Sequence, residues 1–239
     1  MKLAIFSLAL LSPLASAAQC TIDSQYMQAS YKVSQQHEVD TAVHTQQFTL
    51  WRTPTQAAQQ DEQLVEVWQQ LSNQQLRPIR YFVQAKRGIE YQPSEVKAKQ
   101  NFSSKQQLVS DELLAKMTLQ SEHGEGCDKV QKYQLKQPHS TIELTWAVNK
   151  KLLESMQVTN SKSSQTITLQ SVSFNKQTVQ QQFAVWDNYQ TTDYADIGDN
   201  ENDPFLAKMI NLGFIEHSAT GFYDTNGKAL EGGHNHSHH

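Results

Sequence analysis

Hydrophobic and polar residues alternate along most of the middle of the chain, a pattern typical of half-buried β-strands. In Ile142–Val148 every second residue is apolar, and Glu143 lies between the first two apolar positions. Similar runs occupy Gln47–Thr53, Leu64–Gln70, Leu76–Val83 and Arg87–Gln92. The links between these runs are short and polar, so we expect antiparallel hairpins rather than crossover helices.

Two helices are predicted from their end signals and from the spacing of apolar residues. Ser110 can cap the first helix, and Asp203 can cap the second, which has Pro204 at its first position. The segment Tyr26–Val33 fits either a helix or a strand. The residues expected on the buried helix faces are Val109, Leu113, Leu114 and Met117 in the first helix, and Leu206, Met209 and Ile210 in the second.

The order of these elements predicts an α+β fold built on a single antiparallel sheet. We expect the sheet to be strongly curved, as a half-barrel, with two or three helices packed on its concave face. One domain is predicted over residues 18–230, between a signal peptide at residues 1–17 and a flexible tail at residues 231–239.

The N-terminus has the pattern of a secretory signal peptide. A positively charged start precedes the apolar run Leu3–Leu14 and the small residues Ala15-Ser16-Ala17, which form a typical cleavage site. We expect cleavage after Ala17 and a mature chain that is periplasmic or secreted. The apolar run is shorter than the roughly 20 residues that span a membrane, and no later segment is apolar enough, so we predict no membrane-spanning part.

The chain has two cysteines, Cys20 and Cys127. In an oxidising compartment they are expected to form a disulfide. Closing a loop of about 107 residues would stabilise the fold by roughly 4 kcal/mol through the lost entropy of the unfolded chain. The sequence has no C-x-x-C motif, which argues against a redox-active dithiol and against haem attachment.

Composition and motifs exclude further classes of function. The chain has 24 acidic and 20 basic residues and no basic stripe, which argues against nucleic acid as a partner. It contains neither a nucleophilic-serine motif nor a histidine motif typical of zinc hydrolases. We therefore predict a protein without catalytic residues that requires no cofactor.

Two segments near the C-terminus carry candidate metal ligands. Residues 193–203 are rich in the carboxylates that calcium prefers, but their spacing is not that of an EF-hand, and a solvated acidic loop ending in a helix cap explains them better. The tail supplies imidazoles for Zn(II), Cu(II) or Ni(II), and its interrupted histidine run favours a native tail over a cloning tag. The residues concerned are Asp193, Asp196, Asp199 and Glu201 in the loop, and His234, His236, His238 and His239 in the tail.

The segment Thr141–Phe174 resembles the periplasmic lipoprotein-carrier family, the LolA/LolB-like half-barrels. It fits the family's pattern of an apolar strand, a polar turn and a second strand at Leu152, Met156, Val158 and residues 166–169. The stretches YMQASYKVSQQ and FTLWRTP are similar to the family's opening segment and to an early strand. The resemblance covers most of residues 26–175.

This resemblance implies a cavity between sheet and helices that accepts an acyl chain, and Arg52 is a candidate for the family's arginine lock. The residues expected to line the cavity are Trp51, Trp68, Phe82, Tyr91, Trp146 and Met156. These residues could instead fill a solid core, where burial of each would contribute roughly 1.5–3 kcal/mol. We predict an exported carrier for a lipid or a lipoprotein acyl chain, which could also meet a partner protein in the cell envelope. The alternative is a metal-binding or metal-delivery protein that uses its tail.

Overall fold

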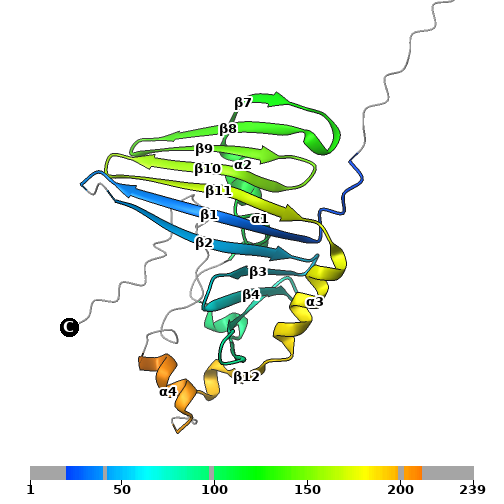
Figure 1. Ribbon diagram of the computed structural model, residues 1–239, viewed down its shortest axis with the longest axis vertical. Coiled ribbons are helices and arrows are strands. Elements are labelled where there is room, and N and C mark those ends of the chain that lie inside the picture. Colours follow the sequence, from blue (N-terminus) through cyan, green and yellow to red (C-terminus); the bar gives the residue numbers. More distant parts are fainter. Residues whose placement is uncertain (1–19, 40–41, 97–99, 199–201, 212–239) are drawn as a thin grey trace, which may run out of the picture.

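The computed structural model describes residues 20–39, 42–96, 100–198 and 202–211 (Figure 1). The predicted signal peptide and the histidine-rich tail lie outside these residues. Within the described part, twelve strands form one open sheet in the order β12-β6-β5-β4-β3-β2-β1-β11-β10-β9-β8-β7. Neighbouring strands are antiparallel, except that β12 runs parallel to β6. The predicted α+β class with one curved, mainly antiparallel sheet is confirmed.

The elements have the following bounds. The strands are β1 (Met27–His37), β2 (Val43–Arg52), β3 (Gln56–Gln60), β4 (Leu64–Gln70), β5 (Leu76–Phe82), β6 (Arg87–Glu90), β7 (Thr118–His123), β8 (Val130–Gln137), β9 (Ser140–Ala147), β10 (Leu152–Asn160), β11 (Ser163–Ser173) and β12 (Gln190–Asp193). The helices are α1 (Phe102–Gln107), α2 (Asp111–Lys116), α3 (Lys176–Asp187) and α4 (Pro204–Asn211), with 3-10 turns η1 (Pro93–Glu95), η2 (Gly126–Asp128) and η3 (Tyr194–Asp196).

Strands appear where the apolar alternation is clear. β4 has the predicted bounds Leu64–Gln70, and the ambiguous segment that begins at Tyr26 becomes strand β1. Strands β3 and β7 were not predicted, because their sequences QAAQQ and TLQSEH offer little apolar alternation. Their place in the sheet comes from hydrogen bonding to β2, β4 and β8 rather than from a local pattern.

The two faces of the sheet carry different helices. We call the face beneath α1 and α2 the inner face, and the opposite one the outer face (Figure 1). Because successive side chains of a strand point to opposite faces, Leu50 of β2 joins the cluster beneath α1 and α2, whereas Trp51 joins the cluster that includes α3. On β4, Val65 and Val67 likewise belong to the α3 cluster, which leaves Trp68 on the inner face.

Helix α3 lies on the outer face and was not predicted. Asn175 caps it, because its Oδ1 accepts the backbone N–H of Thr178 at 3.0 Å. Val179, Phe183 and Trp186 are buried at helical spacing. The residues between them are largely glutamine and other polar side chains, so the apolar stripe is narrow and does not stand out in the sequence.

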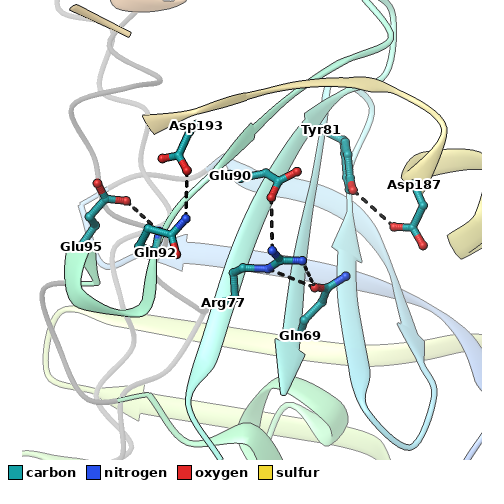
Figure 2. A network of polar contacts seen from close by, with 8 residues as sticks. All are labelled: Gln69, Arg77, Tyr81, Glu90, Gln92, Glu95, Asp187 and Asp193. Atoms are coloured by element: carbon teal, nitrogen blue, oxygen red, sulfur yellow. Dashed lines mark hydrogen bonds and ion pairs between the residues drawn. The ribbon is translucent and has the colours of Figure 1, made fainter. Parts of the chain in front are cut away.

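A set of polar contacts fixes the C-terminal end of α3 and the neighbouring β12 to the sheet (Figure 2). The hydroxyl of Tyr81 donates to Asp187 Oδ1 at 3.4 Å. Gln92 donates from Nε2 to Asp193 Oδ2 at 2.9 Å. Arg77 of β5 forms an ion pair with Glu90 of β6 at 3.4 Å. The Tyr81–Asp187 and Gln92–Asp193 contacts hold together segments that are more than 100 residues apart along the chain.

Helix α4 begins as predicted. Asp203 caps it, because Oδ1 accepts the backbone N–H of Phe205 at 2.8 Å. Leu206 and Met209 are buried on the inner face against Phe82 and its neighbours. The prediction that Ile210 is buried is wrong, because this side chain is 38% exposed at the edge of the contact.

A disulfide joins Cys20 to Cys127, as the sequence predicted. It connects the segment before β1 to η2, which precedes β8. The bond therefore fixes the start of the described chain near β7 and β8, at one edge of the sheet. The two cysteines are 107 residues apart along the chain. None of the helices in the described residues is long and apolar enough to cross a membrane.

Candidate ligand-binding face

The inner face beneath α1 and α2 is an apolar surface that extends over the five neighbouring strands β2, β1, β11, β10 and β9. Its buried residues include Met27, Ala29, Tyr31, Val33, Phe48, Leu50, Ile142, Leu144, Trp146, Leu153, Met156 and Ile167. The helices and their ends contribute Leu108, Val109, Leu113 and Met117 to the same cluster. A continuous apolar surface of this kind is the chemistry that an acyl chain requires.

Two short, separately capped helices lie on the inner face: α1 contacts β2, β3 and β4, and α2 with the turn before it covers the apolar surface. Asn101 Oδ1 accepts the backbone N–H of Ser103 at 2.9 Å, and Ser110 Oγ accepts the backbone N–H of Leu113 at 3.0 Å. Between the helices Leu108 adopts a left-handed conformation with φ of 67°. Leu108 and Val109 of this turn join Leu113 of α2 in the apolar cluster.

Arg52 connects this cover to the sheet. Its Nη1 donates to the backbone carbonyls of Lys151 at 2.6 Å and of Gln106 in α1 at 3.3 Å. Nη2 donates to Lys150 O at 2.6 Å, and Nε donates to Ser24 O at 2.8 Å. Burial lowers the pKa of Arg52 to about 10, so the guanidinium remains charged at neutral pH. One buried cation thus joins the segment before β1, the β9–β10 turn and α1.

Gln106 and Tyr31 make further contacts near Arg52. Gln106 donates from Nε2 to the carbonyl of Thr53 at 2.8 Å, which attaches α1 a second time to the end of β2. Tyr31 stacks on Phe48 at 5.3 Å between ring centroids, and its hydroxyl donates to Leu153 O at 3.0 Å. Burial raises the pKa of Tyr31 above its ordinary value, so this hydroxyl stays protonated.

A buried charged cluster lies next to the apolar surface, between α1 and β4. The Nζ of Lys105 stands 4.0 Å from the centroid of the Trp68 ring. Trp68 donates from Nε1 to Glu66 Oε1 at 2.7 Å, and Glu66 Oε2 lies 3.5 Å from Arg80 Nε. The Arg80 guanidinium in turn lies 5.6 Å from the centroid of the Tyr91 ring.

The electrostatics of Lys105 follow from this position. Burial lowers its pKa to about 8; Arg80 adds to the lowering, and Glu66 opposes it. An open depression of about 570 Å³ lies between α1 and the β4–β5 hairpin. Most of the residues that line it are polar: Gln70, Gln74, Leu76, Gln100, Asn101, Phe102, Ser103, Gln106 and Glu112.

The structure does not bring the six residues expected to line a cavity into one place. Trp146 and Met156 belong to the apolar surface beneath α1 and α2. Trp68 lies under Lys105 in the charged cluster. Phe82 and Tyr91 pack further along the inner face against α4 and η3. The sixth residue, Trp51, lies on the outer face, with its ring edge-on to Trp186 at 5.7 Å between centroids.

The candidate metal ligands are only partly within the described residues. Asp193 Oδ1 accepts the backbone N–H of Ala195 at 3.2 Å and so caps η3. Asp199, Glu201 and the four tail histidines lie outside the described residues. Within the described part, no three His, Cys, Asp or Glu residues are placed to hold a metal ion.

Comparison with known proteins gives weak likenesses in fold. No protein-family profile matches the sequence, and no curated protein matches it significantly. Among solved structures, PNGF-II is 11% identical with a TM-score of 0.34, and the match covers 69% of this chain and 31% of that one. The chain therefore spans about a third of the length of PNGF-II.

Two further solved structures are nearer in size. A domain described as an outer membrane lipoprotein-sorting protein, from Vibrio parahaemolyticus, is 9% identical with a TM-score of 0.33 and covers 68% of this chain and 92% of its own. A LolA superfamily protein from Nitrosomonas europaea is 8% identical with a TM-score of 0.29 and covers 64% and 87%. The similar structures thus include the superfamily that the sequence pattern resembles, at scores too low to assign a function.

The charged cluster was not predicted, although the sequence contains a signal for it. Glu66 sits between Leu64 and Trp68, and Arg80 sits between Pro78 and Phe82, so both charges occupy the inner-face parity of buried strands. A charged residue at such a position must find a partner or a function. Lys105 gives no such signal, because its segment FSSKQQ has no apolar periodicity.

Proposed function

We propose that this protein is an exported, non-catalytic carrier that binds the acyl chain of a lipid or lipoprotein on its inner face. The observation that carries the proposal is the apolar surface over five neighbouring strands with two six-residue helices lying on it. The disulfide between Cys20 and Cys127 supports export, because such bonds persist in oxidising compartments.

The short helices provide a way for the ligand to reach this surface. Helices of six residues have little stability of their own and depend on tertiary contacts. Those contacts are the apolar residues of the cover, such as Leu108 and Leu113, and the hydrogen bonds of Arg52 and Gln106. Movement of α2 and the turn before it, residues 108–117, away from the sheet exposes the apolar surface without breaking the strand pairing, while α1 keeps its contacts with β2, β3 and β4.

The energies of the cover and of a ligand are of similar size. Re-exposing Leu108, Val109, Leu113 and Met117 costs roughly 6–12 kcal/mol, at about 1.5–3 kcal/mol for each buried side chain. An acyl chain of about 16 carbons gains on the order of 10 kcal/mol when its methylenes are buried, at about 0.8 kcal/mol each. A chain of this length therefore compensates for displacing the cover, whereas one of about 6 carbons does not.

Native mass spectrometry tests the proposal directly. The mature protein is purified from the exported fraction without a metal column, and its mass is measured before and after extraction with organic solvent. We expect an added mass of several hundred daltons that the solvent removes. If this mass is missing and the purified chain also fails to bind palmitate, the carrier function is wrong.

Amide hydrogen exchange locates the ligand within the molecule. Addition of palmitate is expected to speed exchange in α2 and the turn before it, because the ligand takes their place on the sheet. Helix α3 on the outer face serves as the internal control and should exchange at an unchanged rate. A bound ligand that leaves exchange in α2 unaltered would place its binding site elsewhere.

A further inference from the structure

Lys105 is a buried cation whose hydrogen-bonding needs are not met. Its side chain is 2% exposed, and Nζ has no hydrogen-bond acceptor within the described residues. The ring of Trp68, 4.0 Å away, provides a cation–π contact, which replaces only part of the hydration that an ammonium group loses on burial. Such a group is stabilised further by any anion that can reach it.

The structure places one carboxylate of this cluster, that of Glu66, beside Lys105. This carboxylate already has other partners. Glu66 accepts the indole N–H of Trp68 through Oε1 and pairs with Arg80 through Oε2. The side chains of Arg80 and Glu66 are only 8% and 13% exposed, so this pair is itself largely shielded from water. Glu66 therefore attracts both Arg80, through the ion pair, and Lys105.

The location of this charge matches the end of an acyl-binding surface. Lys105 lies on α1, one of the two covering helices, and Gln106 next to it is hydrogen-bonded to the end of β2. On one side lies the apolar surface beneath α1 and α2. On the other side the open depression reaches Gln106 and Phe102 of α1 and Gln70 of β4, close in sequence to Lys105 and Trp68. An amphiphile with its chain on the apolar surface could leave its polar end here.

We infer that Lys105, in the positive field that Arg80 adds, binds the acidic headgroup of the carried lipid, a carboxylate or a phosphate. This inference rests on the proposed carrier function, and it adds the chemical class of the ligand: an anionic rather than a neutral amphiphile. The ammonium supplies up to three N–H donors to the headgroup oxygens. The surrounding protein strengthens the attraction, because the site is shielded from water.

The test compares two ligands of equal chain length on the full mature chain after removal of any bound lipid. Palmitate carries a carboxylate and hexadecanol a neutral hydroxyl, so the difference in affinity reports the headgroup site alone. At pH 7 the wild-type protein is expected to bind palmitate about tenfold more tightly. In Lys105→Met this preference disappears while the affinity for hexadecanol remains.

The chain offers a matched control for this substitution. Lys176 also places its Nζ over an aromatic ring, 4.6 Å from the centroid of Tyr26, but it is exposed at the start of α3. Lys176→Met should keep the full preference for palmitate. Lys105→Arg retains the charge and should keep the preference as well, which separates loss of charge from disturbed packing.

Each other outcome overturns a particular statement. Equal wild-type affinities for palmitate and hexadecanol overturn the headgroup site and leave the carrier function standing, and this comparison requires no variant. Failure of both ligands to bind overturns the carrier function. Competition by acetate or inorganic phosphate at the same concentration as palmitate shows a site for small free anions and overturns the assignment to a lipid headgroup.

Discussion

Arg52 at the end of β2 donates a hydrogen bond of 2.6 Å from Nη1 to the backbone carbonyl of Lys151, which lies 99 residues further along in the β9–β10 turn. Lys151 directly precedes β10, and β1 and β11 lie between β2 and β10 in the sheet, so the contact does not join neighbouring strands. The same guanidinium also donates to the carbonyl of Gln106 in α1. The position of the cover is therefore coupled to the geometry of the sheet through one side chain.

Arg52→Met is expected to destabilise the fold and loosen α1. It removes four hydrogen bonds to buried carbonyls, and the free energy of unfolding should fall by roughly 2–4 kcal/mol. Urea unfolding measures this loss, and amide exchange in α1 should become faster. Arg77→Met is the control, because Arg77 forms a more exposed ion pair with Glu90. This substitution should lower the free energy of unfolding by less than about 1 kcal/mol. Equal effects of the two substitutions would contradict a special role of Arg52.

Replacing Lys105 should stabilise the ligand-free protein. Its pKa is about 8 in the folded state and 10.5 ordinarily, so folding disfavours the charged form by about 3 kcal/mol at most. Loss of the cation–π contact offsets part of this gain, and Lys105→Met should raise the free energy of unfolding at pH 7 by roughly 1–3 kcal/mol.

The advantage of Lys105→Met depends on pH in a defined direction. Below pH 8 the lysine is protonated in both states and the penalty is complete. Between pH 8 and about 10.5 the folded state loses the proton while the unfolded state keeps it, so wild-type stability rises and the difference closes. The groups that face Lys105 are Glu66 and Arg80, with Tyr91 beyond them, and all are unchanged in the variant. Urea unfolding of both proteins from pH 6 to 10.5 checks this; a difference that grows with pH would contradict it.

Tryptophan fluorescence can distinguish the two faces. A brominated fatty acid quenches indoles that it contacts, and Trp146 belongs to the inner surface, whereas Trp51 packs against α3 on the outer face. Trp146→Phe should reduce the quenching in a ligand titration, and Trp68, next to Lys105 on the same face, should account for the remainder. Trp51→Phe should leave it unchanged. The opposite result would move the ligand to the outer face.

Loss of the disulfide should destabilise the protein strongly. Replacing Cys20 and Cys127 by serine frees a loop of 107 residues in the unfolded state, which costs roughly 4 kcal/mol in the chain-entropy description. Urea unfolding of the double variant and of the reduced wild-type protein should give similar midpoints. Reductant should have no effect on the double variant, and an effect there would point to another cause.

The histidine tail can be tested apart from the carrier function. Deleting residues 231–239 is expected to remove binding of Zn(II) or Cu(II), measured by titration calorimetry, because the deletion takes away the four imidazoles. Palmitate affinity should stay the same, since the apolar surface is built from residues 27–167. A parallel loss of palmitate binding would connect the tail to the lipid site.

The sequence predicts those elements whose pattern is local. Leu64–Gln70 alternates clearly and has the predicted bounds, and Ser110 and Asp203 cap their helices as expected. Helix α3 could not be predicted from a local pattern. Its three buried residues are stabilised by packing against Trp51 and Tyr81 on the outer face, which only the folded structure shows. The same holds for which face a residue occupies: Trp51 differs from Leu50 by one position, and only the pairing of β2 decides where each points.

The charged cluster around Lys105 is a second feature that the sequence does not predict. Lys105 becomes a site through burial against Trp68, which stands on a strand that ends more than 30 residues earlier. No local pattern in FSSKQQ predicts that burial. The sequence does indicate part of the cluster, because Glu66 and Arg80 are charged residues at strand positions that are otherwise apolar.

The pairing of β1 has a consequence for how the molecule is made. Gln28 of β1 lies opposite Trp51 of β2 on one side and opposite Ser173 of β11 on the other. As the ribosome delivers the chain, the first partner follows at once, but the second arrives only after nine other strands have been synthesised. The edge of β1 that pairs with β11 thus stays unpaired through most of translation. During this time it can pair with other chains. Because β1 and β11 are far apart along the chain, this strand order makes their pairing slow and late in folding.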